Sequence, residues 1–306
     1  MEEAILSKED VPLDRRDDWM EVHNYINAMN EAVKMLEELP FSSRLIRNVH
    51  RILMNGVRGE HKQPGEFRKS QNWIGGSSIN DAIFVPPTHN SIPELMEDIE
   101  KFVHNDKLFF PELLKIALIH YQFETIHPFL DGNGRTGRLM ITLYLVSRGI
   151  LKRPILYLSD YLEKHRNSYY TNLMHVRVDN NIIDWFRFFL TGIIETAENG
   201  VKTFEEILSL QKENEDKVKL LGSRSANALK VLTELYKRPI TDANMVAGIA
   251  DISTASAYTL IANLEKIGIL SEVTGGKRGR VYILKKEANF HVGSASILFY
   301  QDLAEY

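Results

Sequence analysis

Residues 127–138 read HPFLDGNGRTGR and hold the side chains of this chain that are best suited to chemistry. His127 titrates near neutral pH, so it could act as a general base toward a hydroxyl nucleophile. Asp131 offers the hard carboxylate oxygen that Mg²⁺ uses beside substrate phosphates. Arg135 and Arg138 lie on one face of a following helix, where guanidinium groups suit phosphate oxygens. The pattern predicts a phosphate-bound nucleotide, a metal ion and a base that acts on a second substrate.

The backbone around these side chains must end one helix and begin another. Pro128 disfavours helical geometry in the residue before it, so the preceding apolar helix should end there. The segment DGNG then permits left-handed backbone conformations. A new helix is expected to start near Arg135, with the N–H groups of Gly132, Asn133 and Gly134 at its N-terminus. Such amides and the helix dipole together favour an anion.

Three simpler interpretations of this segment compete with that one. DGNG could be a hairpin turn, although its flanks show helical rather than alternating periodicity. An EF-hand loop that starts at Asp131 is excluded, because its sixth and twelfth positions hold Thr136 and Thr142. A phosphate-binding loop of the Walker type is also excluded, since no Gly-Lys-Ser/Thr follows.

The glycines Gly132, Gly134 and Gly137 also spell the dinucleotide-binding pattern GxGxxG. A helix follows, and the stretch PILYLSD ends in Asp160, which imitates the acidic end of a second strand. The true pattern needs an apolar strand directly before the first glycine, and here that place holds TIHPFLD. No second βαβ unit follows, so dinucleotide binding stays a minor alternative.

The composition is that of an ordinary globular protein. The chain has 306 residues, a formal net charge of −4, 44% hydrophobic residues and no cysteine. Disulfide and thiolate chemistry are therefore excluded, and the length allows two or more domains. No run of about 18 apolar residues predicts a membrane span. The start, MEEAILSKED, lacks a signal-peptide pattern, so we expect a cytoplasmic protein without a membrane partner.

Apolar residues recur at three- and four-residue spacing over most of the chain, which predicts a mainly α fold. The expected helices are 17–39, 42–54, 94–103, 113–126, 139–146, 161–176 and 183–197. Residues 70–87 break the pattern with two β-prone pieces around GGSSIND, which predicts an exposed hairpin. These elements belong to a first region, residues 1–205.

A charge-rich stretch, residues 206–224, predicts a helical linker. Three short helices are expected next, at 229–236, 242–250 and 253–267, and then a strand, turn and strand over 271–284. Three helices followed by a hairpin are typical of a winged helix-turn-helix domain, here residues 225–288. Residues 289–306 form a C-terminal tail.

The central segment closely resembles the Fic family signature HPFx[DE]GNGRxxR. All nine fixed positions match: His127, Pro128, Phe129, Asp131, Gly132, Asn133, Gly134, Arg135 and Arg138. Upstream, GEFRKSQNWIGG resembles the flap region of the family, and YLEKHRNSYY with DWFRFFL resembles its downstream part. The resemblance covers roughly residues 17–197. It implies a helical bundle with a β-hairpin flap, and larger members carry a winged-helix appendage.

The function that the resemblance implies is protein adenylylation, in which AMP moves from ATP to a Ser, Thr or Tyr hydroxyl of a target protein and pyrophosphate leaves. By resemblance, His127 deprotonates the hydroxyl and Asp131 holds Mg²⁺. Phe129 should anchor the loop in the core. The nucleotide contacts are expected from Gly132, Asn133, Gly134, Arg135, Thr136, Gly137 and Arg138.

The resemblance also assigns the flap and one downstream tyrosine. Asn72, Trp73, Ile74 and Gly75 match the flap that clamps the backbone of the target, plausibly by strand addition. Tyr169 matches a position that contacts the nucleotide base. Other nucleotides, removal of AMP, transfer of another phosphate-linked group, self-modification and a homodimer stay open. A nucleotide-sensing DNA-binding regulator is the alternative of a different class.

Many relatives carry an inhibitory motif, [ST]xxxE[GN], just upstream of the segment that matches residues 17–39. Residues 1–16 contain no such motif, so either the native start lies further upstream or the chain lacks this brake. A literal match occurs at residues 209–214, SLQKEN. There we favour a solvated linker helix, because charge-rich runs are usually exposed.

Several other residues allow two interpretations. His120 is expected to be a satisfied core histidine rather than a metal ligand, because it has no ligand partners nearby in sequence. Glu124 could be a helix-face acid or a support for the loop, and Trp73 could pack in the core or contact a target. In the C-terminal region, DNA binding and protein docking stay equally open. Lys277, Arg278 and Arg280 could grip phosphates, and Ser256, Tyr258, Thr259 and Asn263 could read base edges.

Overall fold

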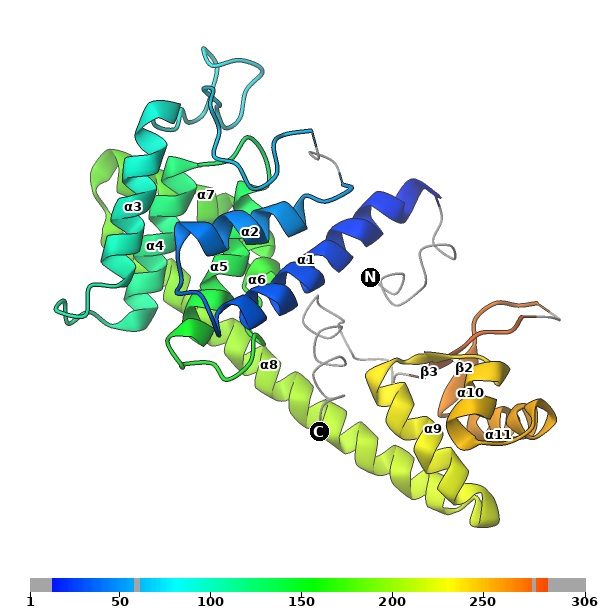
Figure 1. Ribbon diagram of the computed structural model, residues 1–306. Coiled ribbons are helices and arrows are strands. Elements are labelled where there is room, and N and C mark those ends of the chain that lie inside the picture. Colours follow the sequence, from blue (N-terminus) through cyan, green and yellow to red (C-terminus); the bar gives the residue numbers. More distant parts are fainter. Residues whose placement is uncertain (1–12, 58–60, 277–278, 286–306) are drawn as a thin grey trace. The chain divides into compact units, whose positions relative to one another are not determined.

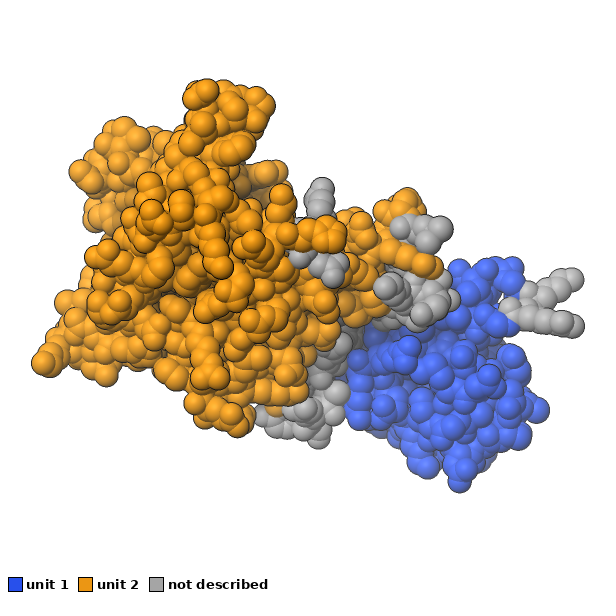
Figure 2. Space-filling view, turned by 45° about the horizontal axis from the view of Figure 1, so that its top comes forward, with its two compact units in different colours: residues 1–11, 198–306 blue, residues 12–197 orange. Residues whose placement is uncertain are grey.

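The computed structural model describes residues 13–57, 61–276 and 279–285. Residues 12–197 form one compact unit, and the described residues from 198 onward lie in a second (Figure 2). The division falls inside one long helix, α8 (Ile182–Lys219). Helices dominate both units, which confirms the predicted mainly α class (Figure 1).

The first unit consists of helices and connecting loops. Its helices before α8 are α1 (Arg16–Met35), α2 (Ser43–Leu53), α3 (Ile92–Val103), α4 (Glu112–Ile126), α5 (Asn133–Ser147), α6 (Ser159–Lys164) and α7 (Arg166–Asp179). Two single turns of 3₁₀ helix, Leu13–Arg15 and His89–Ser91, precede α1 and α3.

Helix α5 lies at the centre of this unit and packs against α1, α2 and α4 (Figure 1). Its residues from Leu139 to Leu145 are all buried, so this part of the helix is enclosed around its whole circumference. Trp185 of α8 is fully buried and donates its indole N–H to the carbonyl of Ala117 in α4, at 3.0 Å. This bond joins α8 to α4 within the buried core of the unit.

The predicted helix over 161–176 is two helices. His165 leaves helical geometry, with φ −108° and ψ 31°, so α6 ends and α7 begins around it. Its ring packs 4.5 Å from that of Tyr161. No glycine or proline marks the break, which explains why periodicity missed it.

The sequence predicts a helix over 183–197 and a separate helical linker over 206–224. The structure instead has one unbroken helix, α8, from Ile182 to Lys219. Gly200 lies within it, and an added Cβ there would meet open space. Beyond it, exposed pairs such as Lys217 with Glu213, at 2.6 Å, support the polar part of the helix.

The flap over residues 70–87 contains less β structure than the hairpin prediction implies. Only one isolated bridge, between Ile74 and Phe84, joins its two sides. At the tip, the carboxylate of Asp81 accepts hydrogen bonds from the backbone N–H and hydroxyl groups of Ser77 and Ser78. The tip is thus a side-chain-stabilised turn rather than an extended ladder.

The second unit has the order helix, strand, helix, helix, strand, strand. Its elements are α9 (Ser225–Lys237), β1 (Ile240–Thr241), α10 (Ala243–Ala250), α11 (Thr254–Lys266), β2 (Leu270–Glu272) and β3 (Tyr282–Leu284). The strands form an antiparallel sheet in the order β1-β3-β2, where β1 was not expected from the sequence. Buried apolar residues of all three helices, with Val218 of α8, form its core.

Some predictions for the C-terminal region fall outside the described residues. These are Lys277, Arg278 and the tail over 289–306. Within the described part of the chain, no single helix is long and apolar enough to cross a membrane. The bent pair α10 and α11 passes the same test together at an angle of 103°, and both helices contribute to the core of the second unit.

Candidate active site

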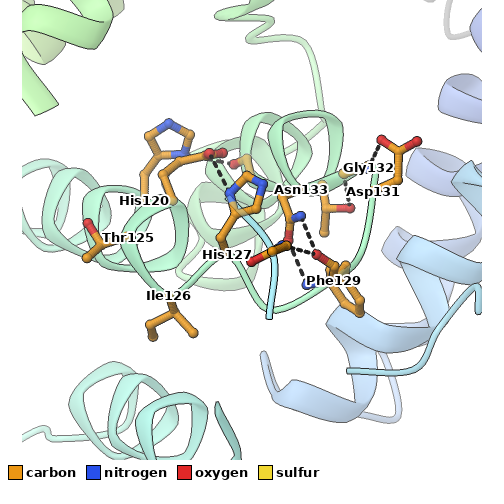
Figure 3. A network of polar contacts seen from close by, with 12 residues as sticks. His120, Thr125, Ile126, His127, Phe129, Asp131, Gly132 and Asn133 are labelled. Atoms are coloured by element: carbon orange, nitrogen blue, oxygen red, sulfur yellow. Dashed lines mark hydrogen bonds and ion pairs between the residues drawn. The ribbon is translucent and has the colours of Figure 1, made fainter. Parts of the chain in front are cut away.

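His127 stands where α4 ends and takes a left-handed backbone conformation, with φ 50° and ψ 61°. Its N–H still donates to the carbonyl of Phe123, at 2.9 Å, as the last bond of the helix. Pro128 follows, so the chain must leave the helix here, as the sequence predicts. The turn brings the imidazole to the junction between α4 and the loop over residues 128–133, called the motif loop below (Figure 3).

The motif loop is fastened by two of its own residues. Phe129 is fully buried, as expected for an anchor. The side chain of Asn133 accepts from the N–H of Phe129 and donates to its carbonyl, both at 2.8 Å (Figure 3). This side chain therefore shapes the loop, and only the backbone N–H of Asn133 remains for a phosphate.

His50 of α2 supports the same loop, and sequence reasoning missed it. Its ring stacks on Phe129 with centroids 3.7 Å apart. Gly65 N–H donates to Nδ1 at 2.7 Å, so Nε2 must carry the proton that it donates to the carbonyl of Asp131, at 2.9 Å. Burial lowers the pKa of His50 to about 4, which keeps this neutral form. A histidine inside an apolar helix pattern gives no sequence signal for such a role.

Arg68 is a second support that the sequence did not reveal. It is almost fully buried, and its guanidinium donates only to carbonyl groups. These belong to Ile126 and His127 at the end of α4 and to Ser70 and Pro87 at the two ends of the flap. One cation therefore joins the base of the flap to the residue that carries the imidazole.

The N-terminus of α5 is open in the way the anion-site prediction requires. The helix begins at Asn133, two residues earlier than expected, and no side chain caps it. In the described residues, the N–H groups of Asn133, Gly134 and Arg135 have no backbone or side-chain acceptor. Gly132 differs from the prediction, because its N–H donates to Oδ1 of Asp131 at 2.6 Å. The free amides of a long, buried helix favour a bound anion.

Gly132 is required for two reasons. Its φ is 76°, and an added Cβ would come within 2.5 Å of Sδ of Met54, the residue that follows α2. A side chain here would therefore both strain the backbone and push the loop off α2.

The two motif arginines have different environments. Arg135 forms an ion pair with Glu21 of α1, at 3.3 Å, and lies 3.3 Å from Sδ of Met54. Arg138 makes no hydrogen bond or ion pair with any described residue, although it is only partly exposed. It is thus the guanidinium that is available for a ligand.

Glu124 and His127 form the electrostatic centre of the site. Burial raises the pKa of Glu124 to about 7, and the charges of Arg138 and Arg177 oppose that shift. Burial also lowers the pKa of His127 to about 4, with a further lowering from the charge of Arg68. At neutral pH the imidazole is therefore neutral, which is the form that can accept a proton.

Tyr169 lies deeper than its predicted contact with a nucleotide base suggests. Its ring is only 6% exposed. Its hydroxyl lies 3.0 Å from Nε2 of His120, whose Nδ1 lies 3.1 Å from the carbonyl of Gly137. Because that carbonyl can only accept, Nδ1 carries the proton and Tyr169 donates to Nε2. His120 is therefore a satisfied core histidine, as predicted.

The predicted flap residues meet the motif loop through Asn72, whose Nδ2 donates to the carbonyl of Phe129 at 3.1 Å. Trp73 is 42% exposed, which places it on the surface rather than in the core. Gly75 has φ 71°, and an added Cβ would come within 2.5 Å of Ile83 across the flap. The flap is thus fixed to the loop at its base and exposes apolar side chains beyond it.

Comparison with known proteins identifies the family that this part of the chain matches. Residues 40–145 match the Fic/DOC family. This part of the chain is a Fic domain. A protein adenylyltransferase Fic from Aedes aegypti is 30% identical over 173 residues, 54% of this chain and 32% of the relative. One from Drosophila virilis is 28% identical over 228 residues, 70% of this chain and 43% of the relative. The chain thus matches less than half the length of these relatives.

A crystal structure of a Fic family protein from Desulfovibrio desulfuricans G20 has the same fold. It aligns with 95% of this chain and 82% of its own, with a TM-score of 0.55 and 18% identity. The helical architecture of the Fic domain is therefore shared with a solved structure.

Two motif positions of the Fic domain have packing roles. The hydroxyl of Thr136 donates to the carbonyl of Gly132 at 2.9 Å, and the residue is fully buried. Gly137 lies against α4, where an added Cβ would come within 2.4 Å of Oε1 of Glu124. Both were predicted to contact the nucleotide, and the structure shows them in contact with protein groups.

The carboxylate of Asp131 is exposed enough to bind a metal ion. It is partly exposed, and only its Oδ1 has a hydrogen-bond partner, the N–H of Gly132. Among the described residues, no group of three or more His, Asp or Glu side chains could hold a metal ion alone. A site with one carboxylate fits Mg²⁺, which typically keeps substrate phosphates and waters as its other ligands.

Proposed function

We propose that this chain is an adenylyltransferase that moves AMP from ATP onto a Ser, Thr or Tyr hydroxyl of a target protein. The observation that carries the proposal is the convergence of three features on the motif. A neutral imidazole, the open N-terminus of α5 and the unpaired guanidinium of Arg138 all belong to residues 127–138. The relatives named adenylyltransferases support the same chemistry.

The chain's own groups account for the transfer step. The hydroxyl oxygen of the target attacks the α-phosphorus, the new P–O bond forms, and the bond to pyrophosphate breaks. Nε2 of His127 takes the hydroxyl proton, because Nε2 makes no hydrogen bond with any described residue and, unlike Nδ1, is not among the enclosed unpaired atoms. The free amides at the start of α5 and the guanidinium of Arg138 bind phosphate oxygens and stabilise their charge.

Asp131 is the residue that would hold Mg²⁺. When bound, the ion neutralises phosphate charge and orients the leaving pyrophosphate. The hydrogen bond from Gly132 fixes the carboxylate of Asp131 against its own loop, and the carbonyl of Asp131 is held by His50. The ligand is therefore oriented before any metal arrives.

The flap is the proposed docking site of the target backbone. Its exposed apolar side chains are Trp73, Ile79, Ile83 and Val85. The single bridge between Ile74 and Phe84 leaves most backbone groups of the flap without a partner strand. An extended target segment could pair with them, which would place its hydroxyl next to the motif.

The test is intact-mass analysis of the chain and of lysate proteins after incubation with ATP and Mg²⁺. We expect a mass gain of one AMP on a target or on the chain itself, abolished in His127→Ala and kept in His175→Ala, an exposed histidine of α7. A mass gain that is equal in the wild type and His127→Ala would reject His127 as the base.

The same experiment separates the alternative functions. Loss of AMP from a pre-modified protein would indicate removal rather than transfer, and a different mass gain would identify another phosphate-linked group. Binding of ATP without any change of mass would favour a nucleotide sensor.

We further propose that the second unit is a winged helix-turn-helix domain. The order of its elements and its antiparallel sheet β1-β3-β2 support this assignment. The first turns of α11 expose small polar side chains and Tyr258, which is 51% exposed, but no arginine. A DNA titration at increasing salt tests the role, and absence of affinity at low salt would leave protein docking.

A further inference from the structure

One buried carboxylate of the Fic domain faces the imidazole and has no assigned role. Oε2 of Glu124 lies 3.9 Å from Nδ1 of His127, and the two residues are one helical turn apart. Their side chains are only 8% and 19% exposed. Oε1 of Glu124 and Nδ1 of His127 are both enclosed by protein without a hydrogen-bond partner. Two complementary groups thus lie within about 1 Å of a hydrogen bond with each other. The backbone carbonyl of Glu124 is a further acceptor that acts on the imidazole.

The packing around Glu124 leaves its carboxylate few alternatives. Gly137 of α5 lies against it, and a Cβ there would come within 2.4 Å of Oε1. The charged and titratable groups that face it are Arg138 from α5 and Arg177 and Tyr169 from α7. Arg177 donates to the backbone carbonyl of Glu124, at 3.4 Å, rather than to its carboxylate. Among the described residues, the ion-pair distance of 4 Å or less from this carboxylate is to His127 and not to either arginine.

We propose that Glu124 is a positioning residue that sets which nitrogen of His127 carries the proton. This inference rests on the proposed function of His127 as the base. An ionised carboxylate only accepts hydrogen bonds, so it requires the proton on Nδ1 and leaves the lone pair on Nε2 free. A protonated carboxyl donates instead to Nδ1, which forces the proton onto Nε2. The first tautomer can accept the hydroxyl proton at Nε2, and the second cannot.

The proton balance of the transfer follows from this arrangement. Before the reaction, His127 is neutral with its proton on Nδ1, directed at the ionised Glu124. The hydroxyl proton moves to Nε2 as the P–O bond forms, and the ring becomes an imidazolium. Glu124 accepts from Nδ1–H and stabilises that cation without taking the proton. After pyrophosphate leaves, Nε2 returns the proton to solvent, and the pair is restored.

The inference predicts a pH switch near neutrality. The carboxyl of Glu124 has a pKa raised to about 7, mainly by burial. Below that pH its protonated form holds His127 in the inactive tautomer, and above it the active tautomer forms. The charges of Arg68 and Arg177 lower the pKa of His127, and the backbone carbonyl of Glu124 and the charge of Asp131 raise it.

The direct test is ¹⁵N NMR of the histidine side chains in the apo protein between pH 6 and 8.5. The His127 signals are identified by their loss in His127→Ala. We expect protonated Nε2 at the acidic end and protonated Nδ1 at the basic end in the wild type. In Glu124→Gln we expect no such change. A single tautomer across the range in the wild type, or a change that survives in Glu124→Gln, would overturn the proposal.

A kinetic test uses AMP transfer by Glu124→Gln, with the exposed Glu97→Gln of α3 as control. We expect kcat to fall roughly 10- to 100-fold in Glu124→Gln. The KM for ATP should stay unchanged, and the acidic limb near pH 7 should disappear. Wild-type kcat and pH profile in this variant would overturn the proposal. If the wild type transfers no AMP at all, the proposed function fails, and the NMR measurement still decides the role of Glu124.

Discussion

The helix that follows the motif loop and the helix pair α10–α11 of the second unit differ in whether side chains cap their first N–H groups. In the second unit, Asp242 caps α10 and Ser253 caps α11, each accepting from backbone N–H groups of the first turn. In the Fic domain, α5 begins without a side-chain cap. Around it, Asn72, Glu124 and His127 each hold an enclosed side-chain atom that lacks a hydrogen-bond partner, and α11 holds one such atom, Nδ2 of Asn263.

This difference distinguishes polar groups that stabilise the fold from polar groups that are available to bind a ligand. Capping and pairing stabilise a helix in the absence of any ligand. Enclosed polar atoms without partners cost free energy unless a ligand or a reaction uses them. The uncapped start of α5 therefore has the character of a site, whereas the starts of α10 and α11 are satisfied by their own side chains. Changes that supply or remove partners test this contrast most directly.

The largest effect is expected from the loss of the metal ligand. Asp131→Asn keeps the size of the side chain but removes its charge, so AMP transfer should fall at least about 100-fold, the equivalent of roughly 3 kcal/mol. EDTA should have the same effect on the wild type, and excess Mg²⁺ should reverse it. Rates of AMP transfer with labelled ATP give the measurement.

The matched control for that change lies in the second unit. Asp251→Asn alters an exposed aspartate at φ 53°, a conformation that asparagine tolerates. Transfer should be unchanged in this variant. Full activity of Asp131→Asn, or of the wild type in EDTA, would remove the metal from the proposed function.

Acid should destabilise the Fic domain through its buried histidines. The pKa values of His50, His120 and His127 are each lowered to about 4, mainly by burial. The unfolded chain therefore binds more protons between pH 6.5 and 4. The stabilisation is complete above pH 6.5 and is lost as the pH falls toward 4, with up to about 3 kcal/mol for each histidine.

The measurement is urea unfolding at pH 7.5, 6 and 5, followed by tryptophan fluorescence. All three tryptophans, Trp19, Trp73 and Trp185, lie in the first unit, residues 12–197, which contains the Fic domain, so the signal reports on that unit. The described residues from 198 onward contain no histidine. In His50→Phe the stacking on Phe129 can persist, while the titration is removed, so its pH dependence should be smaller. Equal slopes for this variant and the wild type would contradict the assignment.

A pair of glycine substitutions compares the packing of the two regions. Gly137→Ala in α5 should destabilise the protein by about 1–3 kcal/mol, because the new Cβ would meet Oε1 of Glu124 at 2.4 Å. Gly248→Ala in α10 has open space around the new methyl group and should stabilise its helix by about 0.5–1 kcal/mol. Thermal unfolding of both variants measures the difference. Destabilisation of equal size in both would show that α5 is no more tightly packed than α10.

Sequence reasoning found the parts of the site that are adjacent in the chain. His127, Asp131 and the two arginines share one short segment, and Pro128 marks the helix end that presents the imidazole. The apolar periodicity likewise predicts α4 and α5, because both helices are buried in the core. Local pattern and local chemistry agree at these positions.

The parts that escaped prediction depend on contacts between distant residues. His50 is 81 residues from the carbonyl that it holds, and Arg68 is 59 residues from that of His127. Neither has a spacing pattern that points to the loop. The pairing of Arg135 with Glu21 of α1 is equally remote in sequence. Only the packing of α1 and α2 against α5 brings these groups together.

The smallest effect is expected at Glu213, the glutamate of the misplaced inhibitory match over residues 209–214. It lies on α8, is 47% exposed at its side chain and pairs with Lys217 at 2.6 Å. Such an exposed pair contributes at most about 1 kcal/mol to stability. In Glu213→Ala, ATP affinity and AMP transfer should therefore stay within about twofold of the wild type, because among the described residues the change removes a single surface pair. Isothermal titration with ATP and the transfer assay measure both. A several-fold gain in ATP affinity would instead make this polar stretch of α8 part of the site, and the contrast between motif and scaffold would no longer hold there.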